Sequence, residues 1–407
     1  MIFCPLFFWV GSDLRVSQEA FYQTAGTALI CSMMFFNIKS IRKNKLNIWL
    51  GIFAVYTIVL FLLGGANLGA TIMMNVFVGT MLYFFILGVK KEDTHILLKT
   101  IIMVGVINII YIALQMLNFD FIFNIRGPGD TILWNTIDPI GFFGLKAPMG
   151  MFMALSAIAT LLVNPILSIA FLAPLWMSRC TGAFMGVIAG VLFYFFWIRR
   201  KIFWIMLPIL LITGSLYVIF VDSPMGMMGN RLPLWKMALK DTVFGYNLRE
   251  PKLQSPYLRN PFTGFGLDAF RNGPIMYFKI CDTETTIRGI RIGDKVYDPQ
   301  GRPFTIDGQS HVTTPDGKKT DIWAETHNSF VQLFYEMGLI GVVIFGFILF
   351  YIKERFKNAF KSKELVTVTS LIICLLFCML TQFPERLSRI GFLIPILLGL
   401  FTVNTDE

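Results

Sequence analysis

A titratable imidazole stands at the sharpest change of polarity in the chain. His327 and Asn328 end a long polar segment, and the apolar run Leu339–Ile352 follows soon after. An imidazole with an ordinary pKa near neutrality can accept the proton of a hydroxyl group. Asn328 or Ser329 would cap the helix that begins here. A simpler interpretation stays open, in which this is only the start of a membrane helix and His327 caps it or reaches the lipid headgroups.

The residues that follow have helical spacing. Phe330, Phe334, Met337 and Gly341 are three or four residues apart, so a helix would place them on one face. Gly338 and Gly341 have no side chain, and we expect them to let a neighbouring helix approach closely.

Two arginines could complement the histidine. Arg231 lies near the start of the long polar segment, beside Trp235, and Arg179 lies between two apolar runs. Guanidinium groups bind phosphate oxygens bidentately, so arginines and an imidazole together suit transfer of a group from a lipid diphosphate to an alcohol. The alternatives are that Arg179 snorkels to the headgroups and that Arg231 is an ordinary interfacial residue beside a tryptophan.

This chemistry requires neither a metal nor a cofactor. The sequence contains no Asp-x-Asp pair, no His-Glu-x-x-His and no glycine-rich phosphate loop. Its six cysteines form neither a disulfide framework nor zinc-ligand spacing. We therefore predict no metal site.

The composition is typical of a membrane protein. Of the 407 residues, 55% are hydrophobic and 15% are charged, and the mean hydropathy is +0.66, whereas soluble domains are about 45–50% apolar and about 25% charged. The net charge of +10 comes from short basic clusters between apolar runs. That pattern indicates membrane topology and not nucleic-acid binding.

The apolar runs predict an all-α polytopic membrane protein with about 11–12 transmembrane helices, since each span needs roughly 20 residues. The twelfth would be Met1–Val10, which is half-length and could instead be a re-entrant stub. The other predicted spans are Ala20–Ile38, Leu46–Ala66, Ala70–Val89, Ile96–Leu117, Gly144–Val163, Pro165–Met177, Thr181–Ile198, Ile202–Val221, Ser329–Ile352, Val366–Leu380 and Ile390–Val403.

Counting these spans places every basic cluster on one side, which the positive-inside rule makes cytoplasmic. The opposite face then carries the long polar segment. We predict three segments: N-terminal transmembrane helices in 1–221, a periplasmic loop subdomain in 222–326, and C-terminal transmembrane helices in 327–407.

The loop subdomain is expected to combine helices with a small β-meander insertion at 281–323. Leu234–Thr242 has a helix-like pattern. Turn signals at 298–301, 307–308 and 315–317 separate four short predicted strands. These strands are Gly289–Val296, Pro303–Ile306, Gln309–Thr314 and Lys319–Trp323.

Several motifs in order resemble the O-antigen ligase and O-antigen polymerase superfamily. They are His327-Asn328 with Gly338-Leu339-Ile340-Gly341, the run Arg231–Leu239 followed by Asn260-Pro261-Phe262-Thr263-Gly264-Phe265-Gly266, Ser178-Arg179, and Gly141–Gly144 with Pro148. The resemblance covers 141–350. Cys180-Thr181 departs from the family's usual small residue after Ser-Arg, and the 281–323 insertion is not part of its usual loop.

The resemblance implies a multi-pass enzyme of the bacterial inner membrane, with a periplasmic active site and no metal or cofactor. It implies an inverting glycosyltransferase acting on an undecaprenyl-diphosphate-linked glycan, with His327 as base and Arg231 and Arg179 on the diphosphate. Asn328, Gly338, Gly341, Trp235, Gly264 and Gly266 would support the site.

Two other functions stay open. The acceptor would be lipid A-core for a ligase, but another lipid-linked glycan for an O-antigen or exopolysaccharide polymerase. A transporter of lipid-linked glycans would need charged residues on broken helices at mid-membrane. Spans such as Thr181–Ile198 contain no charge, which favours chemistry at the surface. The insertion could be a lid or could touch the acceptor.

Overall fold

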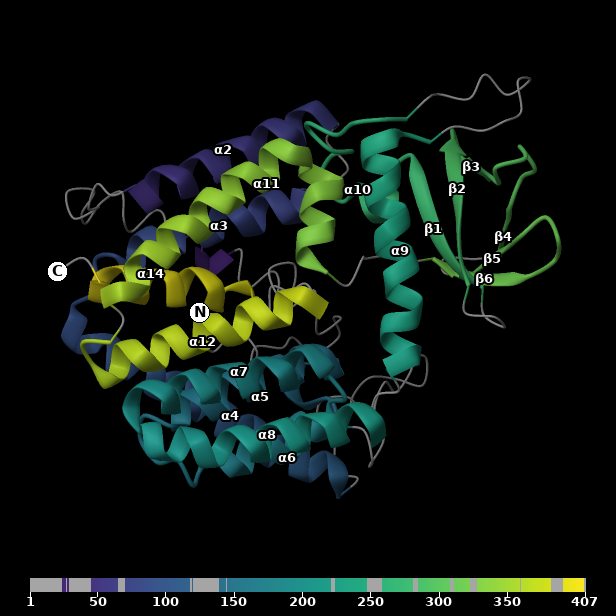
Figure 1. Ribbon diagram of the computed structural model, residues 1–407. Coiled ribbons are helices and arrows are strands. Elements are labelled where there is room, and N and C mark those ends of the chain that lie inside the picture. Colours follow the sequence, from purple (N-terminus) through teal and green to yellow (C-terminus); the bar gives the residue numbers. More distant parts are fainter. Residues whose placement is uncertain are drawn as a thin grey trace. The chain divides into compact units, whose positions relative to one another are not determined.

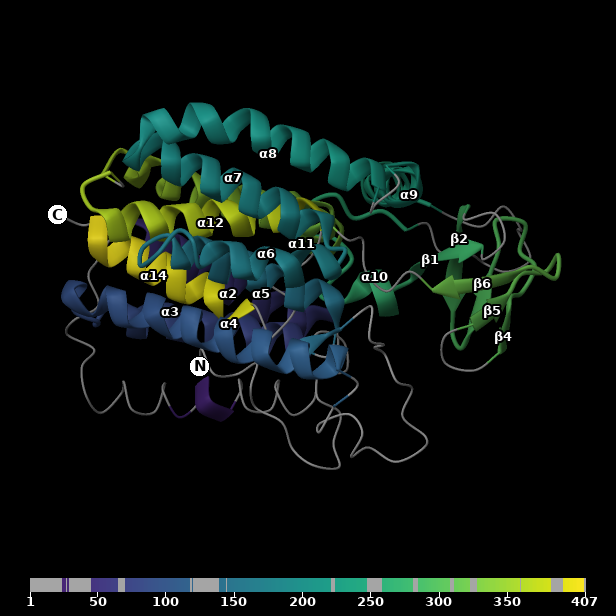
Figure 2. The same cartoon turned by 90° about the horizontal axis from the view of Figure 1, so that it is seen from below.

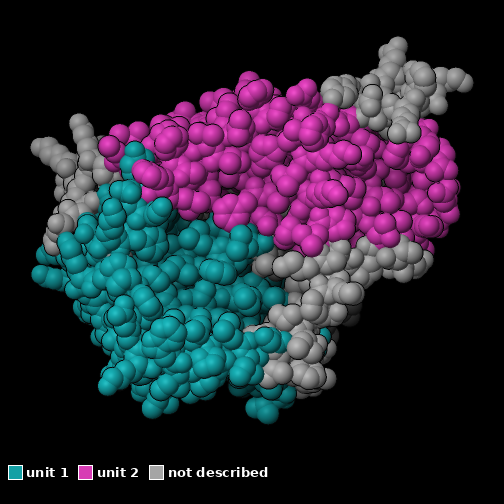
Figure 3. All heavy atoms as spheres, viewed as in Figure 1, with its two compact units in different colours: residues 1–44, 77–222, 351–407 teal, residues 45–76, 223–350 magenta. Residues whose placement is uncertain are grey.

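The computed structural model describes residues 24–26, 28, 45–64, 70–117, 119, 139–143, 145–220, 224–246, 258–280, 285–307, 311–322, 328–358, 360–381 and 391–405. The chain divides into two compact units, which Figure 3 shows in different colours. Unit 1 comprises residues 1–44, 77–222 and 351–407, and unit 2 comprises residues 45–76 and 223–350. These units group residues differently from the three consecutive segments predicted from the sequence.

Unit 1 is a helical bundle (Figures 1 and 2). Its helices are α4 (Thr94–Met116), α5 (Lys146–Thr160), α6 (Ser168–Met177), α7 (Thr181–Ile198), α8 (Arg200–Phe220), α12 (Lys363–Thr381) and α14 (Leu393–Thr405), with most of α3 (Ala70–Ile86). α7 packs closely against α12 and α5. The approach depends on small residues, because a Cβ added at Gly186 would lie 2.7 Å from the Cys374 carbonyl oxygen of α12.

Five helices of the described residues are long and apolar enough to cross a membrane. They cover Lys45–Leu63, Lys91–Met116, Thr181–Ile198, Ser329–Asn358 and Lys363–Leu380, and shorter apolar helices cover Ile72–Ile86, Ser168–Met177 and Leu393–Thr405. The helices therefore suit a membrane protein, while the total of about 11–12 spans stays a prediction. The predicted span Met1–Val10, and all of Ala20–Ile38 except 24–26 and 28, lie outside the described residues.

Unit 2 combines helices with one sheet. Its helices are α2 (Lys45–Gly64), α9 (Pro224–Phe244), α10 (Ala269–Asn272) and most of α11 (Ser329–Arg355). The helix-like pattern at Leu234–Thr242 is confirmed and belongs to the longer α9. α9 lies beside β2 and α10 beside β1 (Figure 1).

The sheet has six antiparallel strands in the order β3-β2-β1-β6-β5-β4. They are β1 (Ile275–Ile280), β2 (Thr286–Ile292), β3 (Lys295–Tyr297), β4 (Thr305–Asp307), β5 (His311–Thr313) and β6 (Lys319–Ile322). The prediction of a simple meander from residue 281 onward was wrong in two respects. It missed β1, which pairs with both β2 and β6, and it joined β2 and β3 across the turn at Gly293.

Each face of β1 packs into a different core. Ile275 and Tyr277 join a cluster with residues of α9, α10 and α11. Met276 and Phe278 join a second cluster with strand and loop residues. Side chains alternate between the faces of a strand, so a strand buried on both faces appears in the sequence as a continuous apolar run.

Candidate functional site

The first turn of α11 is capped by Asn328, one of the two caps that the sequence offers. The Asn328 side-chain oxygen accepts hydrogen bonds from the backbone N–H of Phe330, at 3.0 Å, and of Val331, at 3.1 Å. Asn328 itself is buried. His327, the predicted base, lies outside the described residues. The next residue, Asn328, caps α11, which begins at Ser329.

α11 is broken at Gly338, which the sequence analysis did not predict. Gly338 has φ 64° and ψ −164°, a backbone region that is essentially restricted to glycine. The rings of Phe330 and Phe345 lie 5.9 Å apart, although a straight helix would separate these residues by about 22 Å at 1.5 Å per residue. The two halves therefore fold back on one another, so the candidate span Ser329–Asn358 is not one straight helix but two helical segments joined at Gly338.

A loop of the long polar segment satisfies the backbone groups that this break leaves open. The carbonyl oxygens of Tyr335 and Glu336 accept from the N–H groups of Phe265, at 2.9 Å, and Gly266, at 3.0 Å. The Tyr56 hydroxyl of α2 donates to the Met337 carbonyl at 2.8 Å. Unpaired backbone groups are costly in an apolar environment, so these bonds make the break tolerable.

The second half of α11 is held by the same loop. The N–H of Leu339 donates to the Pro261 carbonyl at 2.8 Å, and that of Ile340 donates to the Phe262 carbonyl at 3.1 Å. Two motifs that are far apart in the sequence, Asn260–Gly266 and the glycine motif at 338–341, thus form one hydrogen-bonded unit.

The four supporting glycines of these motifs act in different ways. Gly264, at φ 70°, has no room for a Cβ, which would meet the Glu336 carbonyl and the Gly338 nitrogen. Gly266, at φ 96°, has open space beside it and is constrained by its backbone conformation alone. A Cβ at Gly341 would meet Met337 of its own helix. The prediction that Gly338 admits a neighbouring helix was wrong, since the loop packs there instead, and for Gly341 it stays a prediction.

The start of α11 and the middle of α9 share one hydrophobic core. Leu234 and Ala238 of α9 are buried in a cluster with Val331 and Tyr335 of α11, and Trp235 packs against it. The core also contains Phe270, whose ring lies 5.2 Å from that of Tyr335. This packing ties the α9 motif to the half-helix that follows His327.

Arg231 occupies the turn of α9 that precedes this core. It lies three residues before Leu234, hence on the same face of the helix, and it is half-buried. Asn328 lies three residues before Val331 in the same way. Because Leu234 and Val331 pack in the same core, Arg231 and Asn328 each lie about one helical turn from that core.

Sequence reasoning missed a polar stripe on the first half of α11. Asn328, Gln332 and Glu336 are spaced four residues apart, and all three are buried. The Gln332 amide donates to the Glu336 carboxylate at 2.6 Å. The four-residue spacing was a readable signal, because buried carboxylates are rare unless they have a partner or a function.

Arg179 belongs to unit 1, in the turn between α6 and α7. It is exposed and has φ 51°, the left-handed region. The turn is fixed by Ser178, whose hydroxyl donates to the Leu175 carbonyl at 2.6 Å and accepts from the Cys180 N–H at 3.2 Å. The convergence of Arg179 with Arg231 stays a prediction.

The motif at Gly141 is also held by buried polar side chains. The Gln115 side-chain oxygen accepts from the N–H of Gly141 at 2.9 Å, and the Asn108 side-chain oxygen accepts from that of Phe142 at 2.8 Å. Gly141 has φ 56°, and a Cβ there would meet Asn108. Two polar residues of α4 therefore position this turn in unit 1.

A buried ion pair ties α9 to the sheet. Asp241 is 1% exposed, accepts from the Tyr277 hydroxyl at 3.1 Å and pairs with Arg288 of β2. The Arg288 guanidinium also lies over the Tyr246 ring, 4.2 Å from its centroid. Burial raises the pKa of the Asp241 carboxyl above its usual value of 3.8, although the charge of Arg288 lowers it.

This shift predicts how stability depends on pH. A raised pKa means that the folded state favours the protonated carboxyl, so the stability Asp241 contributes is complete below pH 3.8 and is lost as pH rises through the raised value. Asp241→Asn removes this dependence. The midpoint of thermal unfolding of the native chain should therefore rise relative to that of Asp241→Asn between pH 7 and pH 4. Asp294→Asn, at an exposed turn, is the control, and a constant or reversed difference would contradict the assignment.

No group of three or more histidine, cysteine or acidic side chains within the described ranges could hold a metal ion. No family model, curated protein or solved structure matches this chain.

Proposed function

We propose that the chain is a membrane glycosyltransferase that moves an oligosaccharide from undecaprenyl diphosphate to a hydroxyl acceptor, in the manner of an O-antigen ligase acting on lipid A-core. The reaction would occur at the periplasmic face of the bacterial inner membrane. It would use no metal and no cofactor.

One observation carries this proposal. Three segments belong to one packed and hydrogen-bonded assembly in unit 2: the α9 motif that contains Arg231, the Asn260–Gly266 loop, and the start of α11 at Ser329, two residues after His327 in the sequence. The first half of α11 packs with α9 and β1, which belong to the polar subdomain.

The proposed reaction assigns each group one task. The acceptor hydroxyl oxygen attacks the anomeric carbon of the glycan, on the side opposite the diphosphate, while its proton passes to the His327 imidazole. The bond between the anomeric carbon and the diphosphate oxygen breaks, and undecaprenyl diphosphate departs with the electron pair. Arg231, and Arg179 if the two converge, would neutralise the charge that develops on the departing diphosphate.

Arg231→Lys tests the diphosphate contact. Lysine keeps the charge but cannot form the two parallel hydrogen bonds of a guanidinium, so transfer should fall about ten- to hundredfold, as expected for losing a charge-assisted bond. The rate of transfer is measured in membranes that contain equal amounts of each variant.

Arg259→Lys is the matched control, because Arg259 is an exposed arginine of the same unit as Arg231. It should keep nearly the native rate. Equal rates for Arg231→Lys and the native chain would show that Arg231 only supplies a positive charge to the surface.

A further inference from the structure

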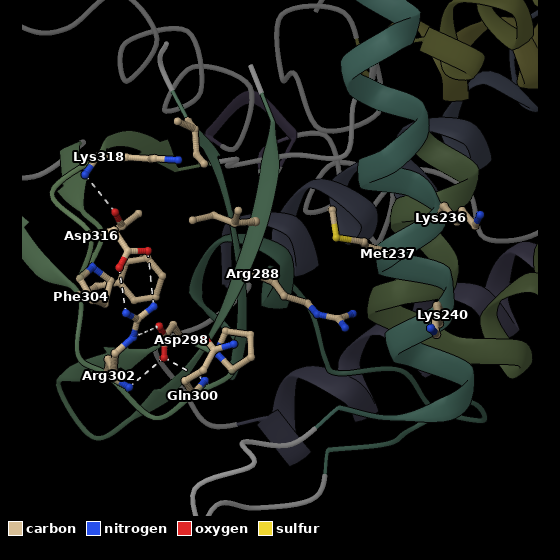
Figure 4. A pocket seen from close by; sticks show the side chains of 15 residues that line it. Lys236, Met237, Lys240, Arg288, Asp298, Gln300, Arg302, Phe304, Asp316 and Lys318 are labelled. Atoms are coloured by element: carbon tan, nitrogen blue, oxygen red, sulfur yellow. Dashed lines mark hydrogen bonds and ion pairs between the residues drawn. The ribbon is translucent and has the colours of Figure 1, made fainter. Parts of the chain in front are cut away.

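Unit 2 contains a pocket of about 570 Å³ between α9 and the sheet, and its lining includes neither His327 nor Arg231 nor Arg179. Its volume lies within the range of about 300–1,000 Å³ that is usual for small-molecule sites. Figure 4 shows side chains of α9 on one wall and side chains of the strands and their turns on the other.

The lining is strongly cationic. Lys236, Lys240, Arg288, Arg302 and Lys318 line the pocket, against two carboxylates. Cations therefore outnumber acids five to two, which gives the pocket a positive potential toward solvent.

Arg302 already engages both carboxylates. Its guanidinium donates to Asp298 at 2.7 Å and to Asp316 at 2.8 Å (Figure 4). This arrangement joins the turn after β3 to the turn between β5 and β6, so it shapes the sheet-side wall. Arg288 is paired with the buried Asp241 beneath the pocket.

The three lysines remain as the cations of the lining that are available to a ligand. Lys236, Lys240 and Lys318 are exposed, and none of them forms an ion pair with another of the residues described here. Lys236 and Lys240 are one helical turn apart, on the same face of α9. Both line the pocket from the side of α9, and Lys318 lines it from the side of the sheet.

The rest of the lining suits a carbohydrate. Phe304, Met237 and Ile287 supply apolar surface, and Gln300 and Thr314 supply an amide and a hydroxyl group. Sites that bind small molecules combine apolar walls with a few polar groups that fix orientation. Apolar surface can contact the C–H faces of sugar rings, whereas the lysines require a ligand with negative charge.

We infer that this pocket binds an acidic oligosaccharide through carboxylate or phosphate groups on its sugars. The inference rests on the proposed function, because it specifies the glycan class that the same subdomain handles. The pocket would hold part of the transferred or accepting glycan while the reaction occurs elsewhere in the assembly.

Binding to the full-length chain in lipid nanodiscs tests the inference. The probes are tetragalacturonate, a phosphorylated maltotetraose and neutral maltotetraose, titrated by calorimetry. At least one anionic probe should bind at least tenfold more tightly than the neutral one, and the preferred anion identifies carboxylate or phosphate as the natural group. Equal affinity for all three probes would overturn the inference.

A pair of matched double variants locates the site. Lys240→Gln/Lys318→Gln removes two exposed pocket lysines, and Lys295→Gln/Lys319→Gln removes two exposed lysines of the same sheet that do not line the pocket. Affinity for the anionic probe should fall at least tenfold in the first variant and less than twofold in the second. Equal losses would place the binding elsewhere.

These experiments distinguish a wrong pocket assignment from a wrong proposed function. If anionic glycans bind in the pocket but no glycan is transferred, the proposed function is wrong and the pocket assignment stands. If transfer depends on His327 but the pocket lysines do not affect binding, the inference is wrong and the proposed function stands.

Discussion

Replacing His327 with alanine is expected to reduce glycan transfer about 100- to 10,000-fold, the usual contribution of a general base. The acceptor hydroxyl would then have no group to receive its proton as the new glycosidic bond forms. Expression and the thermal unfolding midpoint should stay close to native, because the helix cap is supplied by Asn328 and not by His327. The measurement is the amount of glycan attached to the acceptor in cells that carry each variant.

His95→Ala is the control for this experiment. His95 is an exposed residue of α4 whose ring contacts the Glu92 carbonyl, so its loss should leave transfer within twofold of native. Near-native transfer by His327→Ala would remove the histidine from the mechanism.

Gly338→Ala should have the largest effect on folding. Alanine rarely adopts φ 64° with ψ −164°, a conformation that costs about 1–3 kcal/mol for residues other than glycine. Its Cβ would also meet the Phe262 carbonyl and the Gly264 nitrogen, so the loop must move away from α11. We expect a loss of about 2–4 kcal/mol in unfolding free energy, together with loss of transfer.

Gly346→Ala is the internal control, since Gly346 lies in the same helix with open space beside it. Alanine is favoured over glycine in a helix by about 1 kcal/mol, so this variant should be as stable as the native chain or slightly more stable. Thermal unfolding in detergent compares the two. Equal behaviour of the variants would show that the break at Gly338 is not required.

The break also bears on the transporter alternative. Discontinuous helices in transporters leave backbone groups available for a substrate. Here the open groups at 335–340 are engaged by the loop Pro261–Gly266 and by Tyr56. The break in α11 thus provides the backbone groups that bind the loop. This favours a structural role for the break over a transport site.

Local patterns predicted the apolar helices best. Thr181–Ile198 was predicted with the bounds that the structure has, because an uninterrupted apolar run ends there at basic residues. The cap by Asn328 was likewise visible, since capping involves only neighbouring residues.

The features that the sequence did not predict depend on contacts between distant residues. The break at Gly338 is stabilised by the carbonyl groups of Pro261 and Phe262, and no local pattern around Gly338 reveals them. β1 was missed because Ile275–Ile280 is buried on both faces, so it lacks the alternation of a half-exposed strand. The pocket lysines come from α9 and from a turn of the sheet, which only folding brings together.

Reconstitution of the purified chain tests the central claim most directly. Proteoliposomes would receive an undecaprenyl-diphosphate-linked oligosaccharide and a lipid A-core acceptor, with an excess of chelator, and undecaprenyl diphosphate release would be measured. The account predicts release that requires the acceptor, persists with the chelator and yields a glycosidic bond of inverted configuration. Movement of the intact lipid-linked glycan across the bilayer, with no undecaprenyl diphosphate released, would contradict it.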